Sequence, residues 1–118
     1  MVKFTGMAES PKISVLIATY NTPFHLVKRA IDSLWQQTFR DFEVILVDDG
    51  STNDARHELY SYCMRNEERL VYLRQHNQGQ SRAINRAVLL SSGTYLSILD
   101  ADDEYRPEHL QACLRQID

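Results

Sequence analysis

The sequence predicts an α/β domain with a mostly parallel sheet of about four strands and helices on both faces. Short apolar runs, typical of buried strands, alternate with segments whose apolar residues recur at helical spacing. Almost no long loops separate the two kinds of segment. Strands that alternate with helices pair in parallel through right-handed crossovers, so their carboxyl ends should meet along one edge of the sheet.

Four apolar runs are predicted to be the strands. They are Ile13–Ala18, Phe42–Val47, Leu70–Leu73 and Tyr95–Leu99. All four contain β-branched or aromatic residues, which pack well on a pleated surface. The last run is expected to be a buried strand that ends directly at an acidic cluster.

Helical periodicity accounts for the remaining segments. The first helix should start at Pro23, because proline is favoured in the first turn, and the second should be capped within residues 51–53. The third is expected to start around Ser81 and to stop at Gly93, and the fourth starts at Pro107. The residues expected to face the core are Val27, Ala30, Ile31 and Leu34, then Ala55, Leu59, Tyr62 and Cys63, then Ile84, Ala87 and Val88, and finally Leu110, Cys113, Leu114 and Ile117.

Length and composition restrict the class of protein. A chain of 118 residues with 43% hydrophobic and 25% charged residues fits one globular domain with a single core. The net charge of −3, without a basic run, disfavours nucleic acid and anionic membranes as partners. Apolar runs are far shorter than the roughly 20 residues of a transmembrane helix. Cys63 and Cys113 show no metal-binding spacing and are expected to be reduced core residues.

The N-terminal segment, residues 1–11, is expected to be a flexible extension that precedes a domain at 12–118. It lacks the charged start and apolar middle of a signal peptide. We therefore expect a cytoplasmic location, at the inner face of the membrane if the full-length protein carries an anchor.

Polar clusters follow the predicted strands. Residues 19–21 (Thr-Tyr-Asn) follow the first strand, 48–51 (Asp-Asp-Gly-Ser) the second, 75–79 (Gln-His-Asn-Gln-Gly) the third and 100–103 (Asp-Ala-Asp-Asp) the fourth. In parallel sheets ligands bind in the crevice outside the carboxyl ends of the strands. The clusters are therefore predicted to converge on one pocket.

The acidic cluster predicts a metal site. Asp100, Asp102 and Asp103 repel one another unless a positive charge lies between them. A divalent cation bound together with a phosphate would remove that repulsion. Solvated loop carboxylates near a helix N-terminus are the alternative.

The other clusters contain groups suited to a nucleoside diphosphate. Tyr20 offers a ring for stacking on a base, and Asp49 an acceptor for a base N–H or a ribose hydroxyl. The turn Gln78-Gly79-Gln80-Ser81 offers backbone N–H groups at a helix start to a diphosphate, and Arg82 adds further donors. Taken singly, Tyr20 could cover the core, Asp49 could cap a turn and Arg82 could be a solvated helix residue.

The motifs together resemble the family 2 glycosyltransferases of Rossmann-like GT-A fold. The similarity covers nearly the whole chain from Lys12 onward. It rests on the run 13–21, the Gln37-Thr38-Phe39 segment, residues 47–51, the block from Asn77 to Asn85 and residues 99–103.

The resemblance implies a nucleotide-sugar site, usually for a UDP-sugar, and inverting, metal-dependent transfer to a glycan, lipid or protein, as in polysaccharide biosynthesis. Thr19, Tyr20 and Asp49 would surround the base, with Gly79 and Arg82 near the diphosphate, and Asn21 would also belong to the substrate-binding residues. Asp100, Asp102 and Asp103 match the DXD-type motif, in which one carboxylate contacts ribose and another ligates Mn²⁺ or Mg²⁺. We expect Asp102 and Asp103 nearest the metal.

In the family, the catalytic general base and the acceptor region follow that motif, so we expect them beyond Asp118. The chain would then be the nucleotide-binding half of the enzyme, or an inactive nucleotide-binding fragment. Apolar surface at the sheet edge would be exposed, and we expect self-association through it.

Two other classes fit less well. A phosphoacceptor domain similar to response-regulator receivers would carry its acidic pair after the first strand and a lysine after the last, whereas here no lysine follows Lys28. A nucleotidyltransferase would need a glycine-rich basic loop after the first strand, and this sequence has none there.

Overall fold

The computed structural model describes residues 10–65 and 69–117. The predicted N-terminal extension therefore lies almost entirely outside the described residues. In chain order the elements are β1 (Ile13–Thr19), α2 (Phe24–Trp35), β2 (Phe42–Asp48), α3 (Ala55–Arg65), β3 (Leu70–Arg74), α4 (Gln80–Leu90), β4 (Tyr95–Ile98) and α5 (His109–Ile117).

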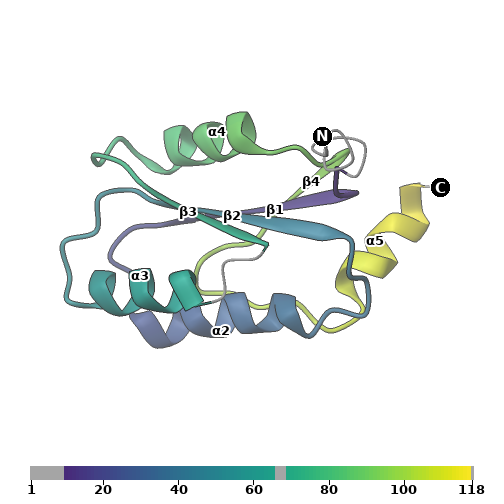
Figure 1. Cartoon of the computed structure of the whole chain (residues 1–118), viewed down its shortest axis with the longest axis horizontal. Helices are drawn as coiled ribbons and strands as arrows, with labels where there is room; N and C mark the ends of the chain where they lie inside the picture. The colour runs from purple at the N-terminus through teal and green to yellow at the C-terminus, as the bar shows by residue number, and fades with distance from the viewer. Residues whose placement is uncertain (1–9, 66–68, 118) are drawn as a thin grey trace, which may run out of the picture.

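The four strands form one parallel sheet in the order β3-β2-β1-β4, which confirms the predicted fold class. Thr19 lies opposite Asp48, and Asp48 lies opposite Arg74, so β1, β2 and β3 end level with one another. β4 is shorter, and its last residue, Ile98, lies opposite Leu16. The polar clusters that follow the strands are therefore brought to one edge of the sheet (Figure 1).

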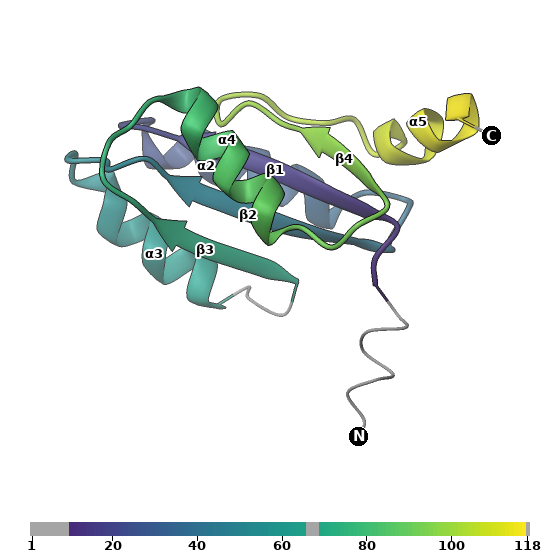
Figure 2. The same cartoon turned by 90° about the horizontal axis from the view of Figure 1, so that it is seen from above.

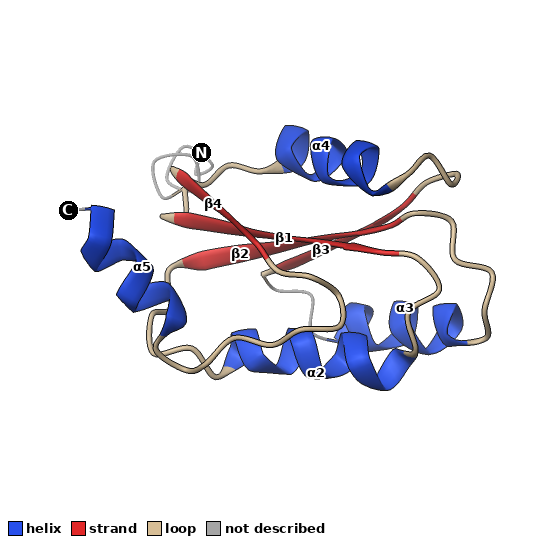
Figure 3. Ribbon diagram, turned by 180° about the vertical axis from the view of Figure 1, so that it is seen from behind, coloured by secondary structure: helices blue, strands red, loops and turns tan. Residues whose placement is uncertain are grey.

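Each face of the sheet has its own core. Alternate residues of β1 and β2 point to opposite faces, as the strand period of two requires. The larger core lies under α2, α3 and α5, and the smaller one under α4 (Figure 3). The larger core includes Val15, Ile17, Val27, Ile31, Leu34, Val44, Leu46, Leu59, Cys63, Leu110 and Leu114, and the smaller consists of Leu16, Ile45, Val47, Ala83 and Ala87.

β4 is an edge strand and not the buried strand that its sequence predicts. Leu96 and Ile98 are 48% and 55% exposed, whereas the following Leu99 is buried. The physical reason is visible in Figure 2, where α4 lies over β1 and β2 and leaves β4 beside it. The helix does not extend over the face that carries Leu96 and Ile98.

Three predicted core positions on the helices are also wrong. Val88 is exposed on α4, where Ala83 and Ala87 make the contact with the sheet. Cys113 and Ile117 are exposed on α5, because only Leu110 and Leu114 of that helix reach the core. Cys63 is buried as predicted.

The ends of three helices differ from the prediction. α5 begins at His109, two residues after the predicted start at Pro107. α4 ends at Leu90, and Gly93 lies beyond it, where a Cβ would come within 2.6 Å of the Ser14 backbone nitrogen. Gly93 therefore allows the chain to pass close to β1 and is not a helix cap. α3 begins at Ala55, so the polar residues 51–53 form the turn that leads to it.

Candidate functional site

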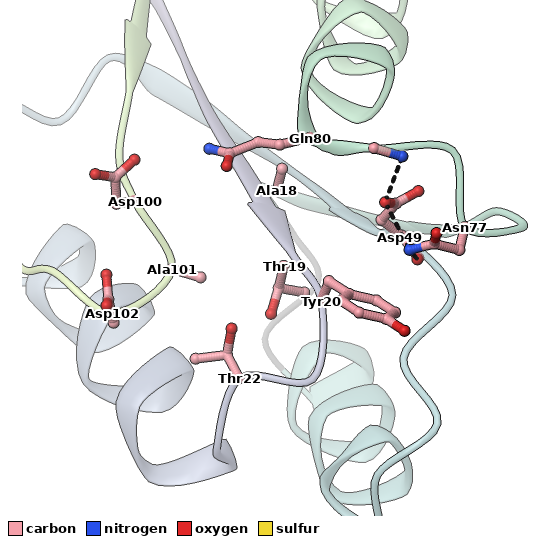
Figure 4. Close-up of a pocket in the computed structure, with 11 residues that line it drawn as sticks. Ala18, Thr19, Tyr20, Thr22, Asp49, Asn77, Gln80, Asp100, Ala101 and Asp102 are labelled. Atoms are coloured by element: carbon pink, nitrogen blue, oxygen red, sulfur yellow. Dashed lines mark hydrogen bonds between the residues drawn. The ribbon is translucent and has the colours of Figure 1, made fainter.

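A pocket of about 490 Å³ lies where β1, β2 and β4 end and α4 begins (Figure 4). Its volume falls within the roughly 300–1,000 Å³ of small-molecule sites. Figure 4 shows Asp100 and Asp102 on one side, and Tyr20, Asp49 and Asn77 on the other. The full lining is Ala18, Thr19, Tyr20, Thr22, Asp49, Asn77, Gly79, Gln80, Asp100, Ala101 and Asp102.

Asp49 organises the far side of the pocket. Its carboxylate is buried, and each of its oxygens accepts two hydrogen bonds. Gln75 Nε2 and the Gln78 backbone N–H donate to Oδ1 at 2.8 and 2.9 Å. Asn77 Nδ2 and the Gly79 N–H donate to Oδ2 at 3.2 and 2.9 Å. One carboxylate thus fixes the whole turn that leads from β3 into α4.

This arrangement corrects one prediction for the diphosphate side. The backbone N–H groups of Gln78 and Gly79 are donated to Asp49 and are not free for a diphosphate. The first N–H groups of α4 itself, from Gln80 onward, belong to the part of a helix that lacks intrahelical acceptors. Gly79 precedes them with a φ of +102°, a backbone conformation that glycine adopts without steric cost.

The hydrogen bonds to Asp49 also decide its charge state. Burial would raise the pKa of this carboxyl, but the bonds from Gln75, Gln78 and Gly79 outweigh burial and lower the pKa below its usual value. Asp49 therefore carries a negative charge at neutral pH, and four hydrogen-bond donors contact its carboxylate.

A pH dependence of stability follows from that lowered pKa. The stabilisation due to Asp49 is fully present above the pKa of an unfolded aspartate, about 3.9, and is lost as the pH falls through the lower folded-state value. We therefore expect the difference in unfolding free energy between the wild-type chain and Asp49→Asn to shrink between about pH 5 and pH 3. Urea unfolding across this range measures it, and a difference that stays constant would contradict the assignment.

Asn21 connects two loops and does not line the pocket. Its side-chain oxygen accepts the backbone N–H groups of Thr52 and Asn53 at 2.7 and 3.0 Å, and its own N–H donates to Ser51 Oγ at 2.8 Å. Its φ of 53° lies in the left-handed region, which asparagine tolerates better than most residues. Asn21 thus holds the loop after β1 against the loop after β2.

Asp48 is fully buried behind the pocket. Its Oδ1 accepts a hydrogen bond from the Ser51 N–H at 2.9 Å. Its Oδ2 accepts hydrogen bonds from the Tyr72 hydroxyl and from Arg74 Nη1, each at 3.2 Å. Burial and the nearby Asp48 charge raise the pKa of the Tyr72 phenol. The first aspartate of the pair is therefore structural, and the second faces the pocket.

The acidic loop presents two carboxylates to the pocket. Asp100 and Asp102 line it and are exposed, whereas Asp103 does not line it. The Asp103 N–H donates to the Asp100 carbonyl at 3.0 Å, which closes a turn. Among the described residues, no group of three or more His, Cys, Asp or Glu side chains is placed so that it could hold a metal ion. The pair fits a cation such as Mg²⁺, which is typically bound by one or two carboxylates together with substrate phosphates.

The structure brings most predicted site residues together. Thr19, Tyr20, Asp49, Gly79, Asp100 and Asp102 share the pocket, whereas Asn21, Arg82 and Asp103 lie outside its lining. The Tyr20 side chain is 50% exposed, so it does not cover the core. Gln80, which belongs to the turn predicted to bind the diphosphate, also lines the pocket, whereas Thr22 and Asn77 were not among the predicted site residues. The signal for Thr22 and Asn77 was positional, since Thr22 lies just before the first helix and Asn77 lies in the loop between β3 and α4.

The described residues include no helix with the length and apolar character needed to cross a membrane. The sequence matches the family described as glycosyl transferase family 2 over residues 14–118. The chain belongs to this family.

Relatives and solved structures agree with the match. The chain is 35% identical over 107 residues to an uncharacterized glycosyltransferase of Methanocaldococcus jannaschii, covering 90% of this chain and 37% of that protein. It is 38% identical over 107 residues to an Escherichia coli chondroitin synthase, covering 91% of this chain and 15% of that protein. A crystal structure of S. aureus TarS 1–349 in complex with UDP-GlcNAc gives a TM-score of 0.79 at 31% identity, covering 91% of this chain and 31% of that one.

Proposed function

We propose that this chain is the donor-binding part of a glycosyltransferase and binds the nucleoside diphosphate of a UDP-sugar with Mn²⁺ or Mg²⁺. The observation that carries the proposal is a single pocket with an exposed aromatic ring and Asp49 on one side and two carboxylates on the other. The family match and the UDP-GlcNAc bound by the similar TarS support it.

Within this proposal, the two sides of the pocket have different roles. Tyr20 stacks on the base, next to Thr19 and Asp49. The Asn77 Nδ2 bond to Asp49, at 3.2 Å the longest of the four, is the one that a base N–H would replace. Gly79, Gln80 and the more distant Arg82 lie on the diphosphate side.

The acidic side would hold the metal. Asp100 contacts ribose, and Asp102, with Asp103 next to it in the chain, holds the cation. When bound, the cation supplies positive charge that stabilises the departing diphosphate. The transfer inverts the anomeric centre, and we infer that its general base and acceptor site lie outside the described residues. The chain spans 37% and 15% of the length of the two relatives named above.

Calorimetric titration of UDP with and without Mn²⁺ tests the proposal, with GDP and ADP as controls. We expect binding of UDP that requires the metal and exceeds that of GDP and ADP. Metal-independent binding, or equal binding of all three nucleotides, would contradict the assignment of the acidic loop or of the base side.

We also propose that the chain self-associates through the edge of β4. Leu96 and Ile98 are exposed on this strand, and Leu89 of α4 is 85% exposed. An exposed apolar edge strand is a template for pairing with another chain. We expect sedimentation to show dimers that Ile98→Lys weakens, whereas Val71→Lys on the opposite edge strand does not. A monomer at high concentration would contradict this proposal.

A further inference from the structure

The acidic loop is held from outside the pocket by helix α2. Arg29 Nη2 donates to the backbone carbonyl of Asp102 at 2.9 Å, and Arg29 Nε lies 3.9 Å from Glu104 Oε2. Arg29 does not line the nucleotide pocket. We propose that Arg29 is a positioning residue that sets the direction of the Asp102 carboxylate; this inference rests on the proposed function.

The physical basis is the geometry of one peptide unit. The carbonyl of Asp102 belongs to the plane that joins Asp102 to Asp103, and that plane is rigid. When Arg29 holds this carbonyl towards α2, the backbone orientation from which both side chains project is fixed. Arg29 binds the carbonyl, so the Asp102 carboxylate stays available on the pocket side, where the structure places it.

Other hydrogen bonds hold the part of the loop from Tyr105 onward, so Arg29 controls only the acidic residues before it. Ser33 Oγ accepts the Tyr105 N–H at 3.1 Å. The buried Gln37 donates Nε2 to the Arg106 carbonyl at 2.8 Å and accepts the Leu110 N–H at 3.1 Å. The Gln37-Thr38 motif found in the sequence lies just after α2 and therefore anchors the distal end of the loop to the segment that follows this helix.

Tyr105 fixes the loop to β4 as well. Its hydroxyl donates to the Ile98 carbonyl at 2.9 Å and lies 2.7 Å from Ser97 Oγ. Between these anchors and Asp100, the hydrogen bond from Arg29 joins the Asp102 carbonyl to α2. A substitution at Arg29 should therefore move the carboxylates without unfolding the domain.

The test compares Arg29→Gln with Arg29→Lys and with Lys28→Gln in the whole chain. Lys28 is the neighbouring residue on α2, and its ammonium group pairs with Asp32 at 2.7 Å. We expect Arg29→Gln to weaken Mn²⁺ binding in the presence of UDP by about 10-fold, the lower end of the effect of residues that orient metal ligands. The melting temperature should match that of Lys28→Gln, and Arg29→Lys should restore part of the Mn²⁺ affinity.

Hydrogen exchange without any ligand separates this inference from the proposed function. We expect faster exchange of the amides of residues 100–104 in Arg29→Gln than in the wild-type chain or Lys28→Gln. Unchanged exchange would overturn the positioning role even if the wild-type chain binds UDP and Mn²⁺. If exchange is faster in Arg29→Gln but the wild-type chain binds no nucleotide, the positioning role of Arg29 stands and the proposed function is overturned.

Discussion

Replacing Asp102 and Asp103 together by alanine is expected to remove metal-dependent UDP binding and to leave the fold intact. Both side chains are exposed, so their loss should change stability by no more than about 0.5 kcal/mol. Removing carboxylates that hold the cation should cost more affinity than the ~10–100-fold lost when residues behind metal ligands are changed. Calorimetry with UDP and Mn²⁺ measures the affinity, and thermal unfolding measures the stability.

The single variants Asp102→Ala and Asp103→Ala show how much of the lost affinity each residue accounts for. Asp102 lines the pocket and Asp103 does not, so Asp102→Ala should account for the larger share. Asp41→Ala is the matched control, because Asp41 is exposed and precedes β2, at the opposite end of that strand from the site. If the double variant binds UDP and Mn²⁺ as well as Asp41→Ala does, the acidic loop is not the metal side of the pocket.

Replacing Asp49 by asparagine is expected to destabilise the domain and to weaken UDP binding together. The side chain is buried and accepts four hydrogen bonds, two of them from backbone N–H groups. Asparagine has nearly the same shape, but its amide group would face donors and lacks the charge. We expect a loss of about 2–3 kcal/mol in unfolding free energy, because hydrogen bonds to a charged group are stronger than average.

Asp41→Asn makes the same chemical change at an exposed position and should alter stability little. Urea unfolding of both variants at neutral pH gives the comparison. A stability of Asp49→Asn equal to that of Asp41→Asn would show that the carboxylate does not hold the turn between β3 and α4.

The fold could be predicted from the sequence because the strand runs, the helical periodicity and the order of the elements all indicated the same α/β arrangement. The runs that become β1 and β2 are apolar at almost every position, and both faces of these strands are buried in the structure. The first helix has a clear apolar stripe, and Val27, Ile31 and Leu34 are all buried. Parallel pairing then placed the polar clusters at one edge without further information.

The wrong predictions of burial in β4 and α5 came from features that the sequence of a single segment does not encode. The run 95–99 is as apolar as a central strand, and only the position of α4 on the sheet leaves Leu96 and Ile98 exposed. Cys113 occupies a helical position among apolar neighbours, yet α5 reaches the core only through Leu110 and Leu114. Local periodicity identifies an apolar face but does not tell how far the neighbouring layer extends.

Within the site, residue types predicted the pocket better than they predicted individual contacts. Asp49 was recognised as an acceptor, but its donors lie on the turn at residues 75–79 and become neighbours only after β2 and β3 pair. No sequence pattern indicated the role of Arg29, because its hydrogen-bond partner is a backbone carbonyl 73 residues away in the chain. Contacts of a side chain with a distant backbone cannot be read from sequence spacing.

In the proposed function, the ends of β1, β2 and β4 and the start of α4 form one nucleotide site, with the metal at the acidic loop. Amide NMR spectra of the chain with UDP and Mg²⁺, followed by substitution of Mn²⁺ for Mg²⁺, test it most directly. We expect UDP to shift the amides of residues 19–22, 77–82 and 100–103 together, and Mn²⁺ to broaden most strongly those of 100–103. Shifts confined to one of these segments, or Mn²⁺ broadening centred elsewhere, would contradict it.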